Sequence, residues 1–358
     1  MIRGESIVDR YLLEWGGEYL TYDRKQLYNP LFPECLDPPK IVIRKISGRR
    51  GLFASYDPEG YYPFSTVIIV LPYSAVAAVK QARTPGGAAE RSKSFDLRYL
   101  LAVLNSRAMR YYFDVMITDG LGVVPQQVNR LPIPKAPAEI QSRLAGLSEK
   151  LLASRRELAE EERVAQFRRV VSTYPRAGDD ELGRYLNKLD EKDLEVRGRL
   201  DSVSRASKIA LSAEMEGDWL LLRVRYRERG SSGEKTGTVR CRFSAPVTSF
   251  LLHAIQDLAE PLLGSGRLMA KVRATPIPRL DSDWEAHLSK ASVVVSKLAQ
   301  HEERVASLRR SVEECEAEID RAVYDLYGLG PDDVRRIEAH HAGSPAYDGG
   351  PDGAAPED

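Results

Sequence analysis

Two long stretches of helical periodicity, far apart in the chain, constrain the fold most strongly. In each stretch apolar residues recur at spacings of three, four and seven, which is typical of a helix with one apolar seam. The stretches cover residues 138–171 and 283–327. Each follows a Pro-Ile-Pro segment, Pro132–Pro134 or Pro276–Pro278, which holds the backbone extended just before the helix begins. The repeated arrangement predicts an antiparallel helical pair that forms a coiled-coil spacer.

Residues 95–134, just before the first long helix, hold a second pattern. Apolar and tyrosine side chains recur at helical spacing over Leu97–Tyr112, which predicts an amphipathic helix. The pattern breaks at Asp119-Gly120, and a short apolar piece then leads to the first Pro-Ile-Pro segment. We therefore expect a helix, a turn and an extended exit in this order.

Several segments predict β-strands, because β-branched residues dominate them or because apolar and polar residues alternate. Lys40–Ile46 and Thr66–Leu71 are of the first kind. Trp219–Arg227 and Thr238–Phe243 are of the second kind, with apolar side chains on one face and arginines on the other. The Gly- and Ser-rich stretch between them predicts a hairpin, and residues 246–263 predict an amphipathic helix over its apolar face. Strands beside long helices predict the α+β fold class.

Composition and charge narrow the classes of function. Residues 1–135 hold 18 Lys and Arg against 13 Asp and Glu, although the chain of 358 residues has no net charge. This mild positive bias permits a polyanionic partner. The three cysteines are scattered, so neither a disulfide framework nor a metal site is expected. The longest apolar run, Val67–Leu71, is far below the roughly 18 residues of a membrane helix, and no signal-peptide pattern opens the chain. We expect no membrane partner and a cytoplasmic location.

Three groups of residues resemble known proteins. The first group is Leu100–Ser106, Tyr111–Phe113, Gly120–Gly122, Gln126–Asn129 and Leu131–Pro134. The second group is Gly4, Ile7, Arg10, Tyr11, Trp15, Glu18, Tyr19, Tyr22 and Asp23. Both resemble the C-terminal specificity domain of TaqI-like DNA methyltransferases and of related type IIG restriction–modification enzymes. The third group, similar to the ending of type IIG and phage-defence methyltransferases, is Ile319, Asp320, Val323, Tyr324, Leu326, Tyr327, Gly328 and Leu329.

The resemblance implies sequence-specific recognition of double-stranded DNA, as the specificity part of a type IIG-like restriction–modification or phage-defence system. It implies no catalytic domain and no cofactor on this chain, with S-adenosylmethionine expected on a partner methyltransferase. The helical spacer is expected to dock that methyltransferase or a restriction subunit. One segment, Leu36–Lys40 (LDPPK), is similar to the catalytic loop of amino-methyltransferases. We do not expect it to be catalytic, because Lys40 stands where that loop needs an aromatic residue to stack on the flipped base.

Together the patterns and the resemblance predict five parts of the chain. They are a mixed α/β target-recognition domain (1–137), a helical spacer with connector (138–205), a small α+β unit with an Arg-rich hairpin (206–282), a long helix (283–330) and a disordered tail (331–358).

Basic and amide side chains in the expected loops and strands are candidates for DNA contact. Arginine suits guanine and phosphate, and glutamine or asparagine suits the major-groove edge of adenine. In the first domain the candidates are Arg44, Lys45, Arg49, Arg50, Arg83, Arg91, Lys93, Gln126, Gln127 and Asn129. The hairpin adds Arg223, Arg225 and Arg240. For each set the alternative is a solvated surface, since charge also keeps sheet edges from aggregating.

Two other classes of function stay open. The chain can be a helical protein-interaction scaffold whose basic loops are only solvated. It can also be a diverged DNA methyltransferase or nuclease fragment that uses an unrecognised site. The second class is disfavoured because we find no Gly-rich cofactor loop, no intact catalytic tetrapeptide and no metal cluster in the sequence.

Overall fold

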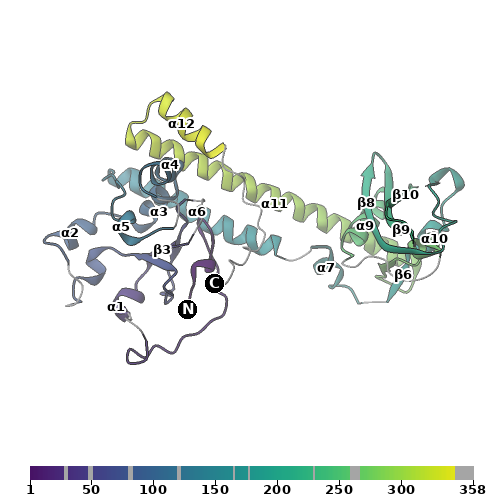
Figure 1. Ribbon diagram of the computed structural model, residues 1–358, viewed down its shortest axis with the longest axis horizontal. Helices are drawn as coiled ribbons and strands as arrows, with labels where there is room; N and C mark the ends of the chain where they lie inside the picture. Colours follow the sequence, from purple (N-terminus) through teal and green to yellow (C-terminus); the bar gives the residue numbers. More distant parts are fainter. Residues whose placement is uncertain are drawn as a thin grey trace. The chain divides into compact units, whose positions relative to one another are not determined.

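The computed structural model describes residues 1–27, 31–46, 51–79, 84–118, 122–163, 166–175, 178–228, 230–258 and 267–342. Three of the candidate DNA contacts, Arg49, Arg50 and Arg83, lie outside the described residues. The chain divides into two compact units. Unit 1 consists of Met1–Leu158 and Leu308–Asp358, and unit 2 consists of Ala159–Ser307. Helices and antiparallel sheets occur together, which confirms the α+β fold class (Figure 1).

Unit 1 is built on a three-stranded antiparallel sheet. The strand β3 (Lys40–Arg44) lies between β4 (Ala54–Asp57) and β5 (Val67–Val70). Its side chains alternate between two cores, because Ile41 and Ile43 join the main cluster of unit 1 and Val42 joins a smaller one. This explains why β3 reads as a continuous apolar run. A short hairpin of β1 (Ile7–Asp9) and β2 (Leu12–Leu13) precedes the sheet.

A buried ion pair joins β3 to β4. Lys40 Nζ lies 2.6 Å from Asp57 Oδ2, and both side chains are fully buried. The Asp57 carboxylate also accepts hydrogen bonds from the backbone N–H groups of Glu59, Gly60 and Tyr61, so it holds the turn that follows β4. Lys40 donates a further hydrogen bond to the carbonyl oxygen of Leu36. Lys40 is thus bound inside the fold rather than presented to a substrate.

Unit 1 has several short helices around this sheet. They are the 3-10 helices η1 (Gly4–Ser6) and η3 (Tyr73–Val76) and the α-helices α1 (Pro33–Leu36), α2 (Ala88–Ser92), α3 (Leu97–Asn105), α4 (Arg107–Met116) and α5 (Pro125–Val128). The sequence predicts one helix where α3 and α4 stand. The structure breaks it at Ser106, whose backbone is extended and whose hydroxyl accepts a hydrogen bond from Met109 N–H, as an N-cap does.

Asn105, the residue before the break, explains why the helix ends at this position. The Asn105 side chain accepts a hydrogen bond from Ala54 N–H at 3.2 Å and donates one to Ala54 O at 3.0 Å. The amide therefore satisfies both backbone groups of Ala54 and fixes the end of α3 against β4. Helical periodicity cannot reveal this break, since the apolar spacing continues across it.

Two long helices complete the core of unit 1. They are α6 (Ala138–Glu162) and the C-terminal part of α11 (Trp284–Tyr327). Arg143 of α6 pairs with Glu318 of α11 at 2.7 Å, and Arg155 pairs with Glu316 at 2.6 Å. The order of the two pairs is antiparallel. His301 of α11 lies 3.2 Å from Glu161 of α6, which is 17 residues along α11 and 18 along α6 from the Arg143–Glu318 pair, so the helices run side by side in opposite directions over this length.

The last described helix replaces part of the expected disordered tail. Residues 331–342 form α12 (Pro331–Ala342), which lies against α4 and α11 (Figure 1). Gly328, with a φ of +64°, ends α11, and Pro331 opens the new helix. Ile337 is buried in the core of unit 1, and Tyr324 of α11 donates a hydrogen bond to Glu338. The prediction of disorder was wrong here because the polar sequence of α12 keeps only a narrow apolar face.

Asp320 of α11 is a buried carboxylate that contacts the start of α4. It accepts a hydrogen bond from Arg107 N–H at 2.7 Å, and burial raises its pKa to about 6. The folded state therefore binds the proton more tightly than the unfolded state, whose carboxyl has a pKa near 3.8. The contribution of this group to stability is fully present below about pH 4 and is lost as the pH rises through 6.

We expect Asp320→Asn to remove this pH dependence. The amide still accepts the Arg107 hydrogen bond but has no proton to lose. Urea unfolding measures the effect. As the pH rises from 4 to 7, the wild type should lose about 3 kcal/mol of unfolding free energy relative to D320N. The matched control is Asp325→Asn, an exposed carboxylate on the same helix. Parallel pH curves for wild type and D320N would contradict this role of Asp320.

Unit 2 is built on a four-stranded antiparallel sheet with the order β7-β10-β9-β8. The expected hairpin is confirmed as β9 (Trp219–Glu228) and β10 (Glu234–Cys241). The strands β7 (Leu194–Arg197) and β8 (Ala206–Glu216) extend it on both sides. Part of the expected connector is therefore folded, since the pairing partners of β7 and β8 come from the hairpin and not from their own weak patterns.

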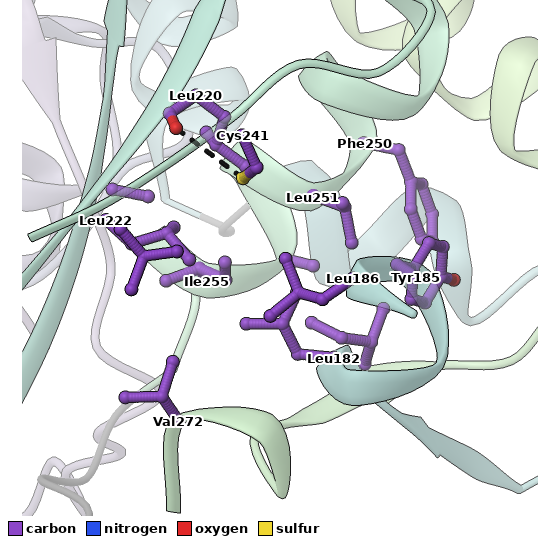
Figure 2. Close-up of a cluster of buried hydrophobic side chains, with 14 of the residues drawn as sticks. Leu182, Tyr185, Leu186, Leu220, Leu222, Cys241, Phe250, Leu251, Ile255 and Val272 are labelled. Carbon is purple, nitrogen blue, oxygen red and sulfur yellow. Dashed lines mark hydrogen bonds between the residues drawn. The ribbon is translucent and has the colours of Figure 1, made fainter. Parts of the chain in front are cut away.

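Helices cover the apolar face of this sheet. They are α7 (Gln166–Val171), α8 (Leu182–Leu186), α9 (Ala245–Gln256), α10 (Leu268–Arg273) and the N-terminal part of α11, with a 3-10 turn, η4 (Glu191–Asp193). A second small sheet pairs β6 (Asp179–Glu181) with β11 (Pro276–Pro278). Figure 2 shows the core that results, with Leu220, Leu222 and Cys241 from the sheet, Phe250, Leu251 and Ile255 from α9, and Leu182 and Leu186 from α8.

Candidate nucleic-acid interface

The end of β3 and the segment before α5 meet in unit 1. Lys45 follows β3, and its carbonyl oxygen accepts a hydrogen bond from Val123 N–H at 2.7 Å. Lys45 N–H donates to Thr66 O at 2.9 Å, so the residue is held from both sides. The structure thereby brings Lys45 close to α5, which carries two of the candidate glutamines. The sequence gives no sign that these two segments meet, because about 80 residues separate them.

The three candidate amides differ in their surroundings. Gln126 and Asn129 are exposed. Gln127 is half-buried, and its side-chain oxygen accepts a hydrogen bond from Val124 N–H at 3.0 Å while its amide nitrogen lies 3.5 Å from Ile117 O. Gln127 therefore holds the turn that opens α5. Gln126 and Asn129 are the amides that a DNA edge can reach.

The candidate cations at the end of β3 are half-buried. Arg44 donates from Nε to the carbonyl oxygen of Ile46 at 2.9 Å, which fixes its side chain along the turn. Lys45 makes no ion pair with any residue in the described part of the chain. Ile46 is 61% exposed and Val124 is 39% exposed. Ile46 and Val124 were not among the candidates for DNA contact. Only the structure shows that they are exposed close to Lys45.

Asp114 of α4 lies close to Gly51, the first described residue after Ile46. A Cβ on Gly51, whose φ is +73°, would lie 2.9 Å from Asp114 Oδ1, so the backbone approaches this carboxylate closely. Burial raises the pKa of Asp114, and His340 Nε2 of α12 lies 3.4 Å from Asp114 Oδ2. The neighbouring Arg110 is half-buried, and the loss of solvent around its guanidinium lowers its pKa to about 10. The C-terminal helix is thus part of the support of this surface.

Arg91 and Lys93 lie elsewhere in unit 1, at α2. Arg91 Nη1 is 3.4 Å from Gly86 O, and Lys93 pairs with Glu90 at 2.6 Å. Both side chains are exposed. No contact between described residues brings them together with Lys45. They form a separate basic segment, held to η3 by the hydrogen bond from Ser74 N–H to the Ser92 hydroxyl.

The arginines of the hairpin in unit 2 are paired with acids. Arg223 lies 2.5 Å from Glu214, Arg225 lies 4.0 Å from Glu234, and Arg240 lies 2.9 Å from Glu216. Since the partners stand on neighbouring strands or at their ends, this face carries both signs of charge. The pairing favours the alternative interpretation, a solvated sheet face, over a ribbon that binds phosphates.

Exposed aromatic rings near the N-terminus were not among the candidate contacts. Trp15 stacks on Tyr61 at 5.9 Å between ring centroids and meets Tyr19 edge to face at 5.0 Å. Tyr19 is 85% exposed. Arg3 lies over the ring of Phe64, 5.0 Å from its centroid. The signal for them in the sequence is that Trp15 and Tyr19 belong to the second group of residues that resembles the TaqI-like domain. Aromatic rings can stack on bases.

The comparison with known families found a similarity, and it lies in unit 1. Residues 1–133 match the TaqI-like C-terminal specificity domain. The match confirms the resemblance of the first two groups of residues and supports a role in DNA sequence specificity within a restriction–modification system, whereas the third group, at residues 319–329, lies outside it. The matched residues end in the Pro-Ile-Pro exit, but α6, α11 and α12 complete the core of unit 1 through residues such as Leu144, Ile319 and Ile337. No curated protein and no solved structure matches the chain at significant similarity.

Two further findings concern other kinds of site. Within the described ranges, no group of three or more His, Cys, Asp or Glu side chains could hold a metal ion. None of the helices that the structure describes is both long and apolar enough to cross a membrane.

We expect Gly122→Ala to weaken DNA binding by disturbing the junction of Lys45 with the segment before α5. Gly122 has a φ of +149°, and a Cβ there would lie 3.0 Å from Lys45 O. The added methyl strains the backbone by about 1 kcal/mol or more and displaces the Val123 hydrogen bond. Affinity for a duplex that the chain retains from a random-sequence pool should fall several-fold in a fluorescence anisotropy titration. Gly86→Ala is the matched control, because its Cβ meets nothing within 4 Å. Equal affinities of the two variants would contradict the role of this junction.

Proposed function

We propose that the chain recognises a specific sequence in double-stranded DNA, as the specificity part of a type IIG-like restriction–modification or phage-defence methyltransferase system. The observation that carries the proposal is the TaqI-like specificity domain over residues 1–133. The methyltransferase, on another chain or another part of the same protein, binds S-adenosylmethionine and flips the target adenine. The helical spacer docks this catalytic partner.

The surface around Lys45 is the proposed site of DNA contact. It joins two cations, Arg44 and Lys45, to the exposed amides Gln126 and Asn129, and this combination suits phosphate and adenine. The hydrogen bonds on both sides of Lys45 support the proposal, because base readout needs side chains on a fixed backbone. The segment Arg91–Lys93 adds phosphate contacts that carry no sequence information.

The experiment that tests this function is selection from a pool of random-sequence duplexes. The purified chain is incubated with the pool at low and at physiological salt, and the retained DNA is sequenced. A motif that is enriched at physiological salt supports sequence-specific recognition. Retention that vanishes with salt and enriches nothing, also in the presence of a co-purified partner, would overturn it in favour of a protein-interaction scaffold.

A further inference from the structure

Unit 2 holds a pocket that DNA recognition by unit 1 does not use. Its volume is about 510 Å³, within the roughly 300–1,000 Å³ that are typical of small-molecule sites. Three aromatic side chains line it, Tyr185, Phe243 and Trp284, and three cations, Lys188, Lys192 and Arg242. Asp193 is the one acid among the lining residues. The pocket thus combines flat apolar walls with an excess of positive charge.

The three cations are held in different ways. Lys188 Nζ lies over Trp284, 4.5 Å from the ring centroid, and makes no ion pair with any described residue. Lys192 is mostly exposed and lies 3.8 Å from Asp190. Arg242 pairs with Asp193 at 2.5 Å, which fixes its side chain. Lys188 is thus the cation without an acidic partner among the described residues, Lys192 has one long and exposed ion pair, and Arg242 is oriented by its ion pair.

The start of α9 adds to this positive field. Ser244 and Val247 line the pocket, so the first turn of the helix borders it. No side chain caps this end of α9. The positive end of the helix dipole and the N–H groups of Ala245 and Val247 favour an anion at such a place, whereas Pro246 between them has no N–H to donate.

The aromatic side of the pocket is rigid. Leu280 N–H donates to His287 Nδ1 at 3.1 Å, so the proton of the neutral ring is on Nε2, which donates to the Tyr185 hydroxyl at 2.5 Å. Burial lowers the pKa of His287 and keeps the ring neutral. Trp284 packs on Tyr185 with ring centroids 5.0 Å apart. The rings are thus fixed before any ligand enters, which limits the entropy lost on binding.

We propose that this pocket binds a nucleoside 5′-monophosphate, either free or as the 5′-phosphorylated end of a DNA strand. The phosphate lies among Lys188, Lys192 and the first turn of α9, and the base lies along the aromatic wall. An inorganic anion alone would leave the apolar walls and most of the volume unused. This site is separate from the DNA contacts proposed for unit 1.

Isothermal titration calorimetry of the full chain at physiological salt tests the proposal. The ligands are thymidine monophosphate, thymidine, inorganic phosphate, and an eight-nucleotide oligothymidylate with a 5′-phosphate or a 5′-hydroxyl. We expect binding of the two 5′-phosphorylated ligands and at least tenfold weaker binding of the others. The tighter of the two 5′-phosphorylated ligands identifies the source of the nucleotide.

Charge reversal locates the site. Lys188→Glu and Lys192→Glu together should weaken binding of thymidine monophosphate at least tenfold, and both side chains are exposed, so the fold is kept. Lys235→Glu is the control, because Lys235 pairs with Glu228 on the hairpin and does not line the pocket. No binding of either 5′-phosphorylated ligand, or equal weakening by the control, would overturn the proposal. Equal affinity for inorganic phosphate would overturn the part that concerns the nucleoside.

Discussion

Asp57→Ala is expected to lower the free energy of unfolding of unit 1 by about 3–5 kcal/mol. The substitution leaves the Lys40 ammonium fully buried without its carboxylate, and three backbone N–H groups of the following turn lose their acceptor. Urea unfolding, with hydrogen exchange of peptides from β3 and β4, measures the effect. Peptides from unit 2 should keep their protection, because the ion pair lies within unit 1.

Two controls separate burial from charge. Glu90→Gln removes the exposed partner of Lys93 and should change the free energy of unfolding by no more than about 1 kcal/mol. Lys40→Met should be less harmful than Asp57→Ala, because the Asp57 carboxylate keeps its three N–H donors. A loss below about 1 kcal/mol for Asp57→Ala would show that water or another group replaces the carboxylate.

The second large effect is expected on DNA affinity. Arg44→Gln, Lys45→Gln and Gln126→Ala together should weaken binding of the selected duplex about 100-fold, since each specific base or charged contact contributes about 1–3 kcal/mol. The slope of log affinity against log salt should also fall by about two, one for each lost phosphate contact. Anisotropy titrations at several salt concentrations measure both quantities.

The hairpin of unit 2 supplies the matched comparison. Arg223→Gln, Arg225→Gln and Arg240→Gln remove one more positive charge than the first set, but each of these arginines already pairs with a glutamate. We therefore expect less than a twofold change in affinity and an unchanged salt slope. If this variant loses affinity as strongly as the first, the ribbon is part of the interface and the paired face opens on binding.

The sequence alone determined the elements that depend on local patterns. The long helices α6 and α11, the strand β3 and the hairpin of β9 and β10 follow from periodicity and from turn residues, which act within a few residues of one another. The prediction of one helix over 138–171 was wrong in its length, because α6 ends at Glu162 and α7 (Gln166–Val171) is a separate helix that packs in unit 2. The first two groups of residues, within 100–134 and 4–23, also indicate a TaqI-like specificity domain without the structure, because the resemblance rests on residue types and their spacing along the chain.

The tertiary structure alone decided what depends on partners far apart in the chain. Asn105 breaks a periodic helix because it binds Ala54. The helix α12 forms because its narrow apolar face is buried in unit 1, and β7 and β8 are strands because a hairpin pairs with them. The same holds for the candidate site. Only the fold shows that Val123 N–H donates a hydrogen bond to Lys45 O and that Arg223 forms an ion pair with Glu214. Hydrogen bonds and ion pairs depend on distance in space and not on distance along the chain.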